Sequence, residues 1–127
     1  MYWYLAKMVY RIVSENSSLK PQFDEQFRLI RADDVQWAWE KAVVIGRKEE
    51  CAFLNTHNET VRWKFIAVED VCQVDDIDDG VQLYAQTREP ADVEEYISLV
   101  QSRAKRQLAF RFERSEENTM LPRTSFL

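Results

Sequence analysis

Few side chains in this sequence belong to the types that carry out catalysis. His57 is the single histidine, and Cys51 and Cys72 are the two cysteines. A histidine can act as a general base, and an exposed thiolate can act as a nucleophile. His57, however, lies in the polar stretch 55–59 with no serine or cysteine beside it, which is typical of a surface turn. Each cysteine lies in or beside a strand-like pattern, so we expect both to be buried, free thiols.

Metal binding needs several ligands at a suitable spacing, and the sequence offers two weak patterns. One histidine cannot complete a four-ligand zinc site with two separated cysteines. The acidic stretch 75–80 ends in Gly80, as a calcium loop beginning at Asp75 requires at its sixth position. Ile77 and Gln86 then occupy the third and twelfth positions and break the pattern. We interpret the stretch as a solvated turn, with a weak, opportunistic cation site as the alternative, and we expect no metal or cofactor.

Basic side chains segregate to one side of the predicted strands. If the even-numbered residues of the first strand face the core, Lys7 and Arg11 lie on the other face. Later strands would add Arg28, Arg62 and Lys64 to that face. Such a surface could bind a small anionic ligand, a single-stranded nucleic acid or an acidic partner. The alternative is an ordinary solvated sheet face, on which lysine and arginine are common.

The charge balance argues against duplex nucleic acid as a ligand. The chain has 17 Lys and Arg against 22 Asp and Glu, a formal net charge of −5 at pH 7. The α-β-β-β-α order predicted from Asp33 onward imitates a double-stranded-RNA-binding domain, whose last helix must present basic residues to phosphates. Here that helix begins with the acidic stretch 89–95, which has the wrong sign. We therefore expect no binding of double-stranded nucleic acid.

Alternation of apolar and polar residues predicts the strands that position these side chains. The even-numbered residues of 2–13 are all apolar, which indicates a half-buried strand. A second strand follows at 23–31 after a polar loop, with Phe23, Phe27 and Leu29 on its predicted core face. A short loop between two such strands favours an antiparallel hairpin.

Three further strands are predicted at 51–54, 60–74 and 81–88. Within the long middle strand the alternation is disturbed at Glu69 and Asp70, which favours a bulge there.

Two helices complete the expected fold. Asp33 is the predicted N-cap of the first helix, with Gln36 completing a capping box. This helix should end near residues 47–50, and its core stripe comprises Val35, Ala38, Trp39, Ala42, Ile45 and Gly46. Pro90 is predicted at the first position of a second amphipathic helix that reaches about residue 108.

These elements predict an α+β fold with a single antiparallel sheet of about five strands, in the order β-β-α-β-β-β-α. The length predicts one domain over residues 1–112, followed by a loosely ordered C-terminal tail at 113–127. No apolar stretch is long enough to span a membrane. The apolar start of the chain is interrupted by Lys7 and Arg11, so we expect no signal peptide and a cytoplasmic location.

Scattered residues also carry a family resemblance. They are Trp3-Tyr4, Ala6-Lys7, residues 29–32, Glu59, Val61, residues 63–65, Val68, Asp70-Val71 and Asp79-Gly80. Over roughly residues 2–84 they resemble a bacterial family known as domain of unknown function 4288 (DUF4288). The resemblance implies no activity, cofactor or catalytic residue.

Three functional classes remain, and the sequence favours a non-catalytic module that binds a protein partner, above all a second copy of itself. Unassigned aromatic and branched residues motivate this reading, because clusters of them often mark contact surfaces. The candidate interface residues are Trp3, Val9, Trp37, Val44, Phe110 and Phe112. The alternative is that the second predicted helix covers these residues within a single chain. A binder acting through the basic sheet face is the second class, and an enzyme is the third, since no nucleophile, base and electrophile converge.

Overall fold

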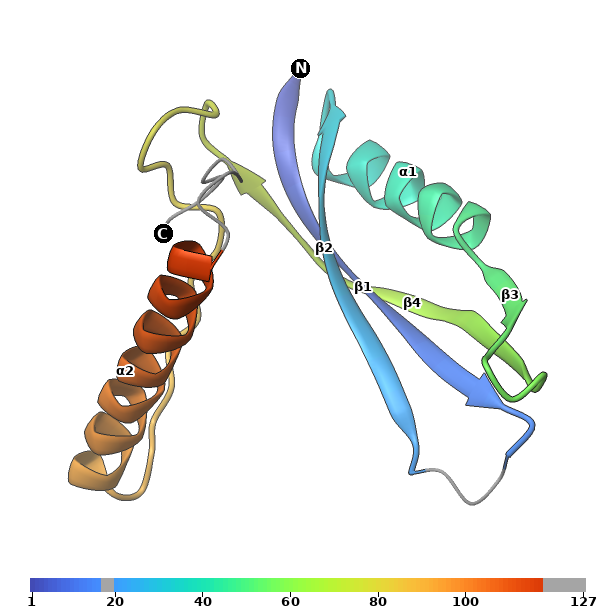
Figure 1. The fold of residues 1–127 in the computed structure, drawn as a ribbon. Helices are drawn as coiled ribbons and strands as arrows, with labels where there is room; N and C mark the ends of the chain where they lie inside the picture. The colour runs from blue at the N-terminus through green and yellow to red at the C-terminus, as the bar shows by residue number, and fades with distance from the viewer. Residues whose placement is uncertain (17–19, 118–127) are drawn as a thin grey trace. The chain divides into compact units, whose positions relative to one another are not determined.

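β1 (Tyr2–Ser14) is an inner strand of the sheet, and the rest of the sheet is arranged around it. The strand order is β2-β1-β4-β3, where β2 is Gln22–Ala32, β3 is Cys51–Leu54 and β4 is Thr60–Val74. All three pairings are antiparallel, and the predicted β1–β2 hairpin is confirmed. The helix α1 (Val35–Lys48) lies along one face of this curled sheet (Figure 1). This computed structural model describes residues 1–16 and 20–117.

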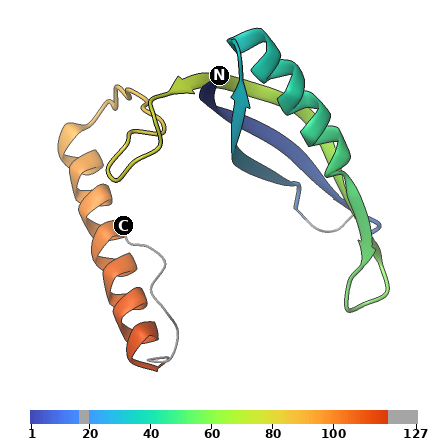
Figure 2. The same ribbon diagram turned by 90° about the horizontal axis from the view of Figure 1, so that it is seen from above.

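The core forms between the even-numbered side chains of β1 and α1. Ala6, Met8 and Tyr10 are completely buried, as are Ala38 and Ala42 on the helix. The two alanines let α1 approach the sheet closely, so large strand side chains fill the space between them. We call this side of the sheet the α1 face and the opposite side the outer face; Figure 2 shows the helix on the α1 face only.

The α1 stripe predicted from the sequence is correct in part. Ala38, Ala42 and Gly46 are buried, whereas Val35 and Trp39 are exposed. The helix is capped by Asp34 rather than Asp33, because the Asp34 carboxylate accepts a 2.8 Å hydrogen bond from the Trp37 amide. The helix starts one residue later than a cap at Asp33 would place it, so the predicted capping box with Gln36 is wrong.

The core face predicted for β2 is also wrong. The pairings Leu5–Leu29, Lys7–Phe27 and Arg11–Phe23 place the three large apolar residues of β2 on the outer face. Phe23, Phe27 and Leu29 are all exposed there. The α1 face of β2 is polar over most of its length and apolar only at its end, where Ile30 and Ala32 are buried.

β4 contains the predicted bulge. Lys7 pairs with Asp70 while Met8 pairs with Val68, so Glu69 is the additional residue. A second shift leaves Ile66 unpaired between Ala67 and Phe65. Two bulges in one strand restore the original facing, so Phe65 points to the α1 face and stacks edge-on against Tyr10.

The strand predicted at 81–88 does not form, so the sheet of the described residues has four strands, and the element order is β-β-α-β-β-α. The α+β class and the antiparallel sheet are confirmed. Tyr84 contacts the Phe27 ring at 5.9 Å between centroids, on the outer face. Residues 81–88 thus have no backbone ladder to the sheet, although the Tyr84 ring contacts it.

Chain contacts divide the protein into two units, Met1–Gln86 and Thr87–Leu127. The second unit contains α2 (Val93–Glu117), which begins after Asp92 rather than at Pro90, since the Asp92 carboxylate caps the Glu95 amide. The side chains of residues 93–113 are all exposed. Residues 113–117 of the predicted tail belong to α2, and the remainder of that prediction lies outside the described residues. Neither described helix is long and apolar enough to cross a membrane.

Candidate interaction surfaces

The structure separates the five candidate ligand-binding residues onto two faces. Lys7 and Arg11 lie on the outer face, together with Lys64 and Arg62, which pair with Arg11 and Val13. Arg28 instead pairs with Ala6, so it lies on the α1 face, 4.0 Å from the Glu49 carboxylate. The reason is that the whole of β2 faces opposite to the way its aromatic residues suggested.

Lys7 is already engaged in the folded chain. Its ammonium lies 2.9 Å from Glu69 and 3.1 Å from Glu25, and it lies over the Phe27 ring. The hydrogen bonds to Glu69 and Glu25 raise the pKa of Lys7 above its ordinary value. The bulge at Glu69 brings one of these carboxylates to the lysine. Lys7 is therefore part of a local ion-pair cluster.

Arg11, Arg62 and Lys64 form a second cationic group with a different character. All three are exposed, and Arg11 lies directly opposite Lys64 across the β1–β4 ladder. Within the described part of the chain, none of the three forms an ion pair. Phe23 lies opposite Arg11 on its other side. Like charges directly opposite each other cost stability, so this basic cluster is electrostatically unrelieved in the free chain.

The six candidate interface residues come from three different elements. Trp3 and Val9 are half-buried on the outer face, where Arg31 lies over the Trp3 ring. Trp37 and Val44 are exposed on α1. Phe110 and Phe112 are exposed on α2, in the second unit.

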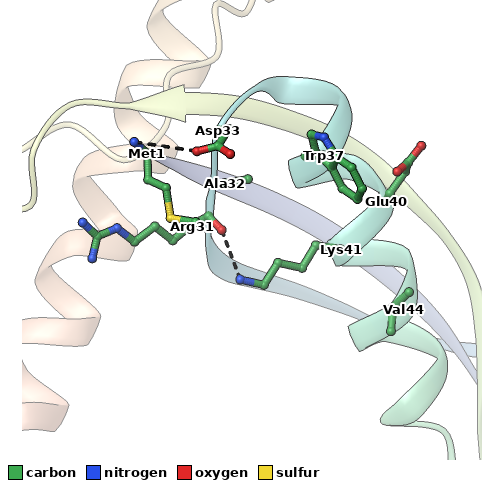
Figure 3. A pocket seen from close by; sticks show the side chains of 8 residues that line it. All are labelled: Met1, Arg31, Ala32, Asp33, Trp37, Glu40, Lys41 and Val44. Atoms are coloured by element: carbon green, nitrogen blue, oxygen red, sulfur yellow. Dashed lines mark hydrogen bonds and ion pairs between the residues drawn. The ribbon is translucent and has the colours of Figure 1, made fainter.

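Trp37 and Val44 line a groove of about 510 Å³ in the first unit. Figure 3 shows its two walls. Successive turns of α1 form one wall, and the end of β2 together with the N-terminus forms the other. The remaining lining residues are Met1, Arg31, Ala32, Asp33, Glu40 and Lys41. Lys41 reaches across this groove and donates a 3.1 Å hydrogen bond to the carbonyl oxygen of Arg31. The groove therefore lies beside the edge of β2.

β2 is an edge strand of the sheet, and this fact could not be read from the sequence. Its 11 residues make it one of the long strands, and among residues 1–16 and 20–117 it pairs only with β1. On its α1 face, the Gln26 amide donates to Asp24 at 2.7 Å and accepts from Arg28 at 2.9 Å. The Trp63 indole also donates to Asp24, at 3.0 Å. Asp24, Gln26 and Arg28 form a half-buried polar row along the edge strand.

The histidine and the two cysteines are not among the residues that line the groove or form the basic cluster. His57 is exposed in a turn, where its backbone amide donates to the Asn55 side chain, so the predicted surface turn is confirmed. Both cysteines are free thiols, but Cys51 is exposed and Cys72 only half-buried, so the prediction that both are buried is wrong. Burial raises the pKa of the Cys72 thiol. Across residues 1–16 and 20–117, no group of three His, Cys, Asp or Glu residues is arranged to hold a metal ion.

Comparison with known proteins gives one informative match. The search of curated proteins and the search of solved structures each returned no match to this chain. A family model described as a domain of unknown function covers residues 3–85, which is nearly the whole of the first unit. That stretch contains all of the sheet except Tyr2, the whole of α1, the basic cluster and all of the groove lining except Met1. The chain belongs to the DUF4288 family.

Proposed function

We propose that this DUF4288 domain works by binding protein, and that its partner is a second copy of the chain. The free edge of β2 is the observation that carries this proposal. An edge strand presents a row of unpaired N–H and C=O groups, which another strand can pair with. Long edge strands are usually covered, bulged or interrupted by proline, because otherwise they associate without control.

The surroundings of the edge support its use as a contact surface. The groove beside it exposes Trp37 and Val44, an aromatic and a branched side chain. On the outer face, the edge strand itself exposes Phe23, Phe27 and Leu29. A partner strand added to β2 would cover apolar side chains on both faces at once. Apolar area of this kind, rather than the backbone bonds alone, makes an association stable.

Sedimentation equilibrium of the full chain at micromolar concentration tests the proposal. We expect a dimer, and we expect the variant Leu29→Pro to sediment as a monomer. Proline removes one edge N–H and is tolerated where that group faces solvent. The matched control is Leu29→Ala, which shortens the same side chain but keeps the amide, so it should dimerise more weakly than the wild type but more strongly than Leu29→Pro. A wild-type chain that is monomeric throughout the micromolar range would overturn the proposal.

A second candidate function is supported by the basic cluster of Arg11, Arg62 and Lys64. A bound polyanion would relieve the repulsion between these side chains, and Phe23 beside them offers a ring for a base to stack on. We propose single-stranded nucleic acid as this ligand. Fluorescence anisotropy with a labelled single-stranded oligonucleotide should show salt-sensitive binding.

The specificity of that binding can be tested on the same sheet face. Changing Arg11, Arg62 and Lys64 together to Glu should abolish it, whereas Lys7→Gln should change it little, since Lys7 is held by Glu25 and Glu69. Equal losses in both variants, or no binding by the wild type, would remove this candidate.

A further inference from the structure

The outward-facing groups of β2 can be assigned from one contact. The Arg31 carbonyl accepts from Lys41 on α1, so it points away from β1. In an antiparallel edge strand, alternate residues direct both backbone groups outward. The odd-numbered residues of β2 therefore offer the free groups, and the even-numbered residues pair with β1. The Cys72 thiol on β4 donates to the Leu5 carbonyl at 3.9 Å, so this carbonyl points toward β4. The backbone groups of odd-numbered β1 residues therefore face β4 and those of even-numbered residues face β2, which agrees with the assignment.

From this edge we propose that two copies of the chain pair through β2 in antiparallel orientation, with Gln26 of each copy on the two-fold axis. The inference rests on the self-association proposed above and adds its interface and register. In this register Asp24 of one copy lies opposite Arg28 of the other, and the symmetry gives this pair twice. Phe23 lies opposite Leu29, and Glu25 lies opposite Phe27. About eight backbone hydrogen bonds would form, two for each pair of outward-facing residues.

Charge complementarity selects this register over its neighbours. Side chains directly opposite each other must lie on the same face of the sheet. The two-fold axis must therefore pass at a residue of β2 and not between two residues, and the possible registers differ in which residue that is. An axis at Glu25 or at Arg28 places like charges opposite each other, which is destabilising. An axis at Phe27 places Asp24 opposite Ile30 and forms no ion pair. Only the axis at Gln26 pairs Asp24 with Arg28 and leaves no like charges together.

The ends of the free edge fit the same register. The next outward-facing pair would join Pro21 to Arg31 of the second copy. Pro21 has no N–H to donate. The carbonyl that this N–H would meet is the Arg31 carbonyl, which Lys41 already occupies. The N–H that Pro21 lacks would therefore have met a carbonyl that already has a partner. The paired segment runs from residue 22 to residue 30.

The polar row on the α1 face is prearranged for this contact. Gln26 holds Asp24 on one side and Arg28 on the other, all along the edge strand. Even-numbered residues would form the closely spaced, non-hydrogen-bonded pairs of the new ladder, with Cα atoms about 4.5 Å apart. Two such rows meeting at Gln26 would bring each carboxylate to a guanidinium, and charge-assisted bonds of this kind are the stronger ones.

Charge exchange tests the register directly. Asp24→Arg alone places Arg opposite Arg28 twice, and Arg28→Asp alone places Asp24 opposite Asp twice, so each variant should sediment as a monomer. An equimolar mixture of the two variants should form a heterodimer, because every pair is then of opposite sign. Circular dichroism of each variant checks that it folds. A single variant that dimerises like the wild type, or a mixture that stays monomeric, would overturn the register.

Cysteine cross-linking gives an independent readout that does not depend on the charged residues. In a Cys51→Ser background, Gln26→Cys should form an intermolecular disulfide rapidly, because the predicted Cα separation is within the range for disulfides, about 4.4–6.8 Å. The matched control is Gln22→Cys on the same strand, whose two copies would lie about 26 Å apart, eight residues of strand. If the wild type is a dimer but Gln22→Cys cross-links and Gln26→Cys does not, this interface is refuted while self-association stands.

Discussion

The Tyr10 hydroxyl donates a 2.7 Å hydrogen bond to the carbonyl oxygen of Gly46, joining an inner strand of the sheet to the last turn of α1. Carbonyls in the last turn of a helix have no partner within the helix. Tyr10 is fully buried, so this bond supplies the missing partner at a place that water does not reach. It also determines how far along the sheet the end of α1 lies.

Replacing Tyr10 with Phe should therefore destabilise the domain. The ring would stay in place, and the loss would come from the unsatisfied carbonyl, worth about 1–3 kcal/mol. Urea unfolding followed by circular dichroism measures the change. The control is Tyr2→Phe on the same strand, where the ring is exposed and the stability should not change. A Tyr10→Phe variant as stable as the wild type would show that the bond contributes nothing.

The same residue predicts a loss of stability at high pH. Burial raises the pKa of the Tyr10 phenol above its ordinary value of 10.0. Because the folded pKa is the higher one, the neutral phenol is favoured by folding. Its contribution is complete below pH 10 and is lost as the pH rises through the folded pKa. We expect the free energy of unfolding to fall above pH 10, and to fall less steeply in Tyr10→Phe. Parallel slopes for the two proteins would contradict this.

Gly46 should not tolerate a side chain. A Cβ added there would lie against the Phe65 ring, closer than real Cβ atoms approach other atoms. In an exposed helix, Gly→Ala stabilises by roughly 0.5–1 kcal/mol, so the ordinary expectation has the opposite sign. Here we expect Gly46→Ala to destabilise by about 1–3 kcal/mol, as overpacked cores do. Thermal unfolding of Gly46→Ala and of the double variant Gly46→Ala/Phe65→Leu would show whether replacing the ring by a smaller aliphatic side chain relieves the clash.

Local patterns predicted four of the five expected strands and both helices, because each depends on neighbouring residues, whereas the strand expected at 81–88 does not form. Local sequence patterns were sufficient to predict the strand β1, the bulge at Glu69 and the buried positions Ala38 and Ala42 of α1. The same information failed for β2, where the larger residues are not the buried ones. Burial there depends on which face α1 covers, and only Ile30 and Ala32 at the end of the strand show it.

The candidate surfaces were harder to predict, because they depend on the order of strands across the sheet. Lys7 looks available in the sequence, yet the bulge brings Glu69 to it. Arg28 was assigned to the wrong face through the error in β2. The edge position of β2 and its polar row at Gln26 have no local signal at all. The edge position of β2 becomes clear only when β1 is seen to lie between β4 and β2.

The identity of the N-cap gives a sharp test between sequence and structure. Asp34 accepts from the Trp37 amide, so Asp34→Ala should cost about 1 kcal/mol of stability. Asp33→Ala should cost little, because its one ion pair, with the N-terminal ammonium, is long and exposed at 4.0 Å. Urea unfolding of both variants under the same conditions measures the difference. A larger loss for Asp33→Ala would restore the cap predicted from the sequence.

The two cationic groups of the outer face should respond to mutation in opposite ways. Lys7→Met removes the ammonium that separates the Glu25 and Glu69 carboxylates, so we expect it to destabilise the domain. Arg11→Met removes a charge that faces Lys64, so it should leave the stability unchanged or raise it. Both effects should shrink in about 0.5 M NaCl, because salt screens charges that are partly exposed. Thermal unfolding at low and high salt measures them, and a loss of stability in Arg11→Met at low salt would mean that Arg11 has an attractive partner in solution.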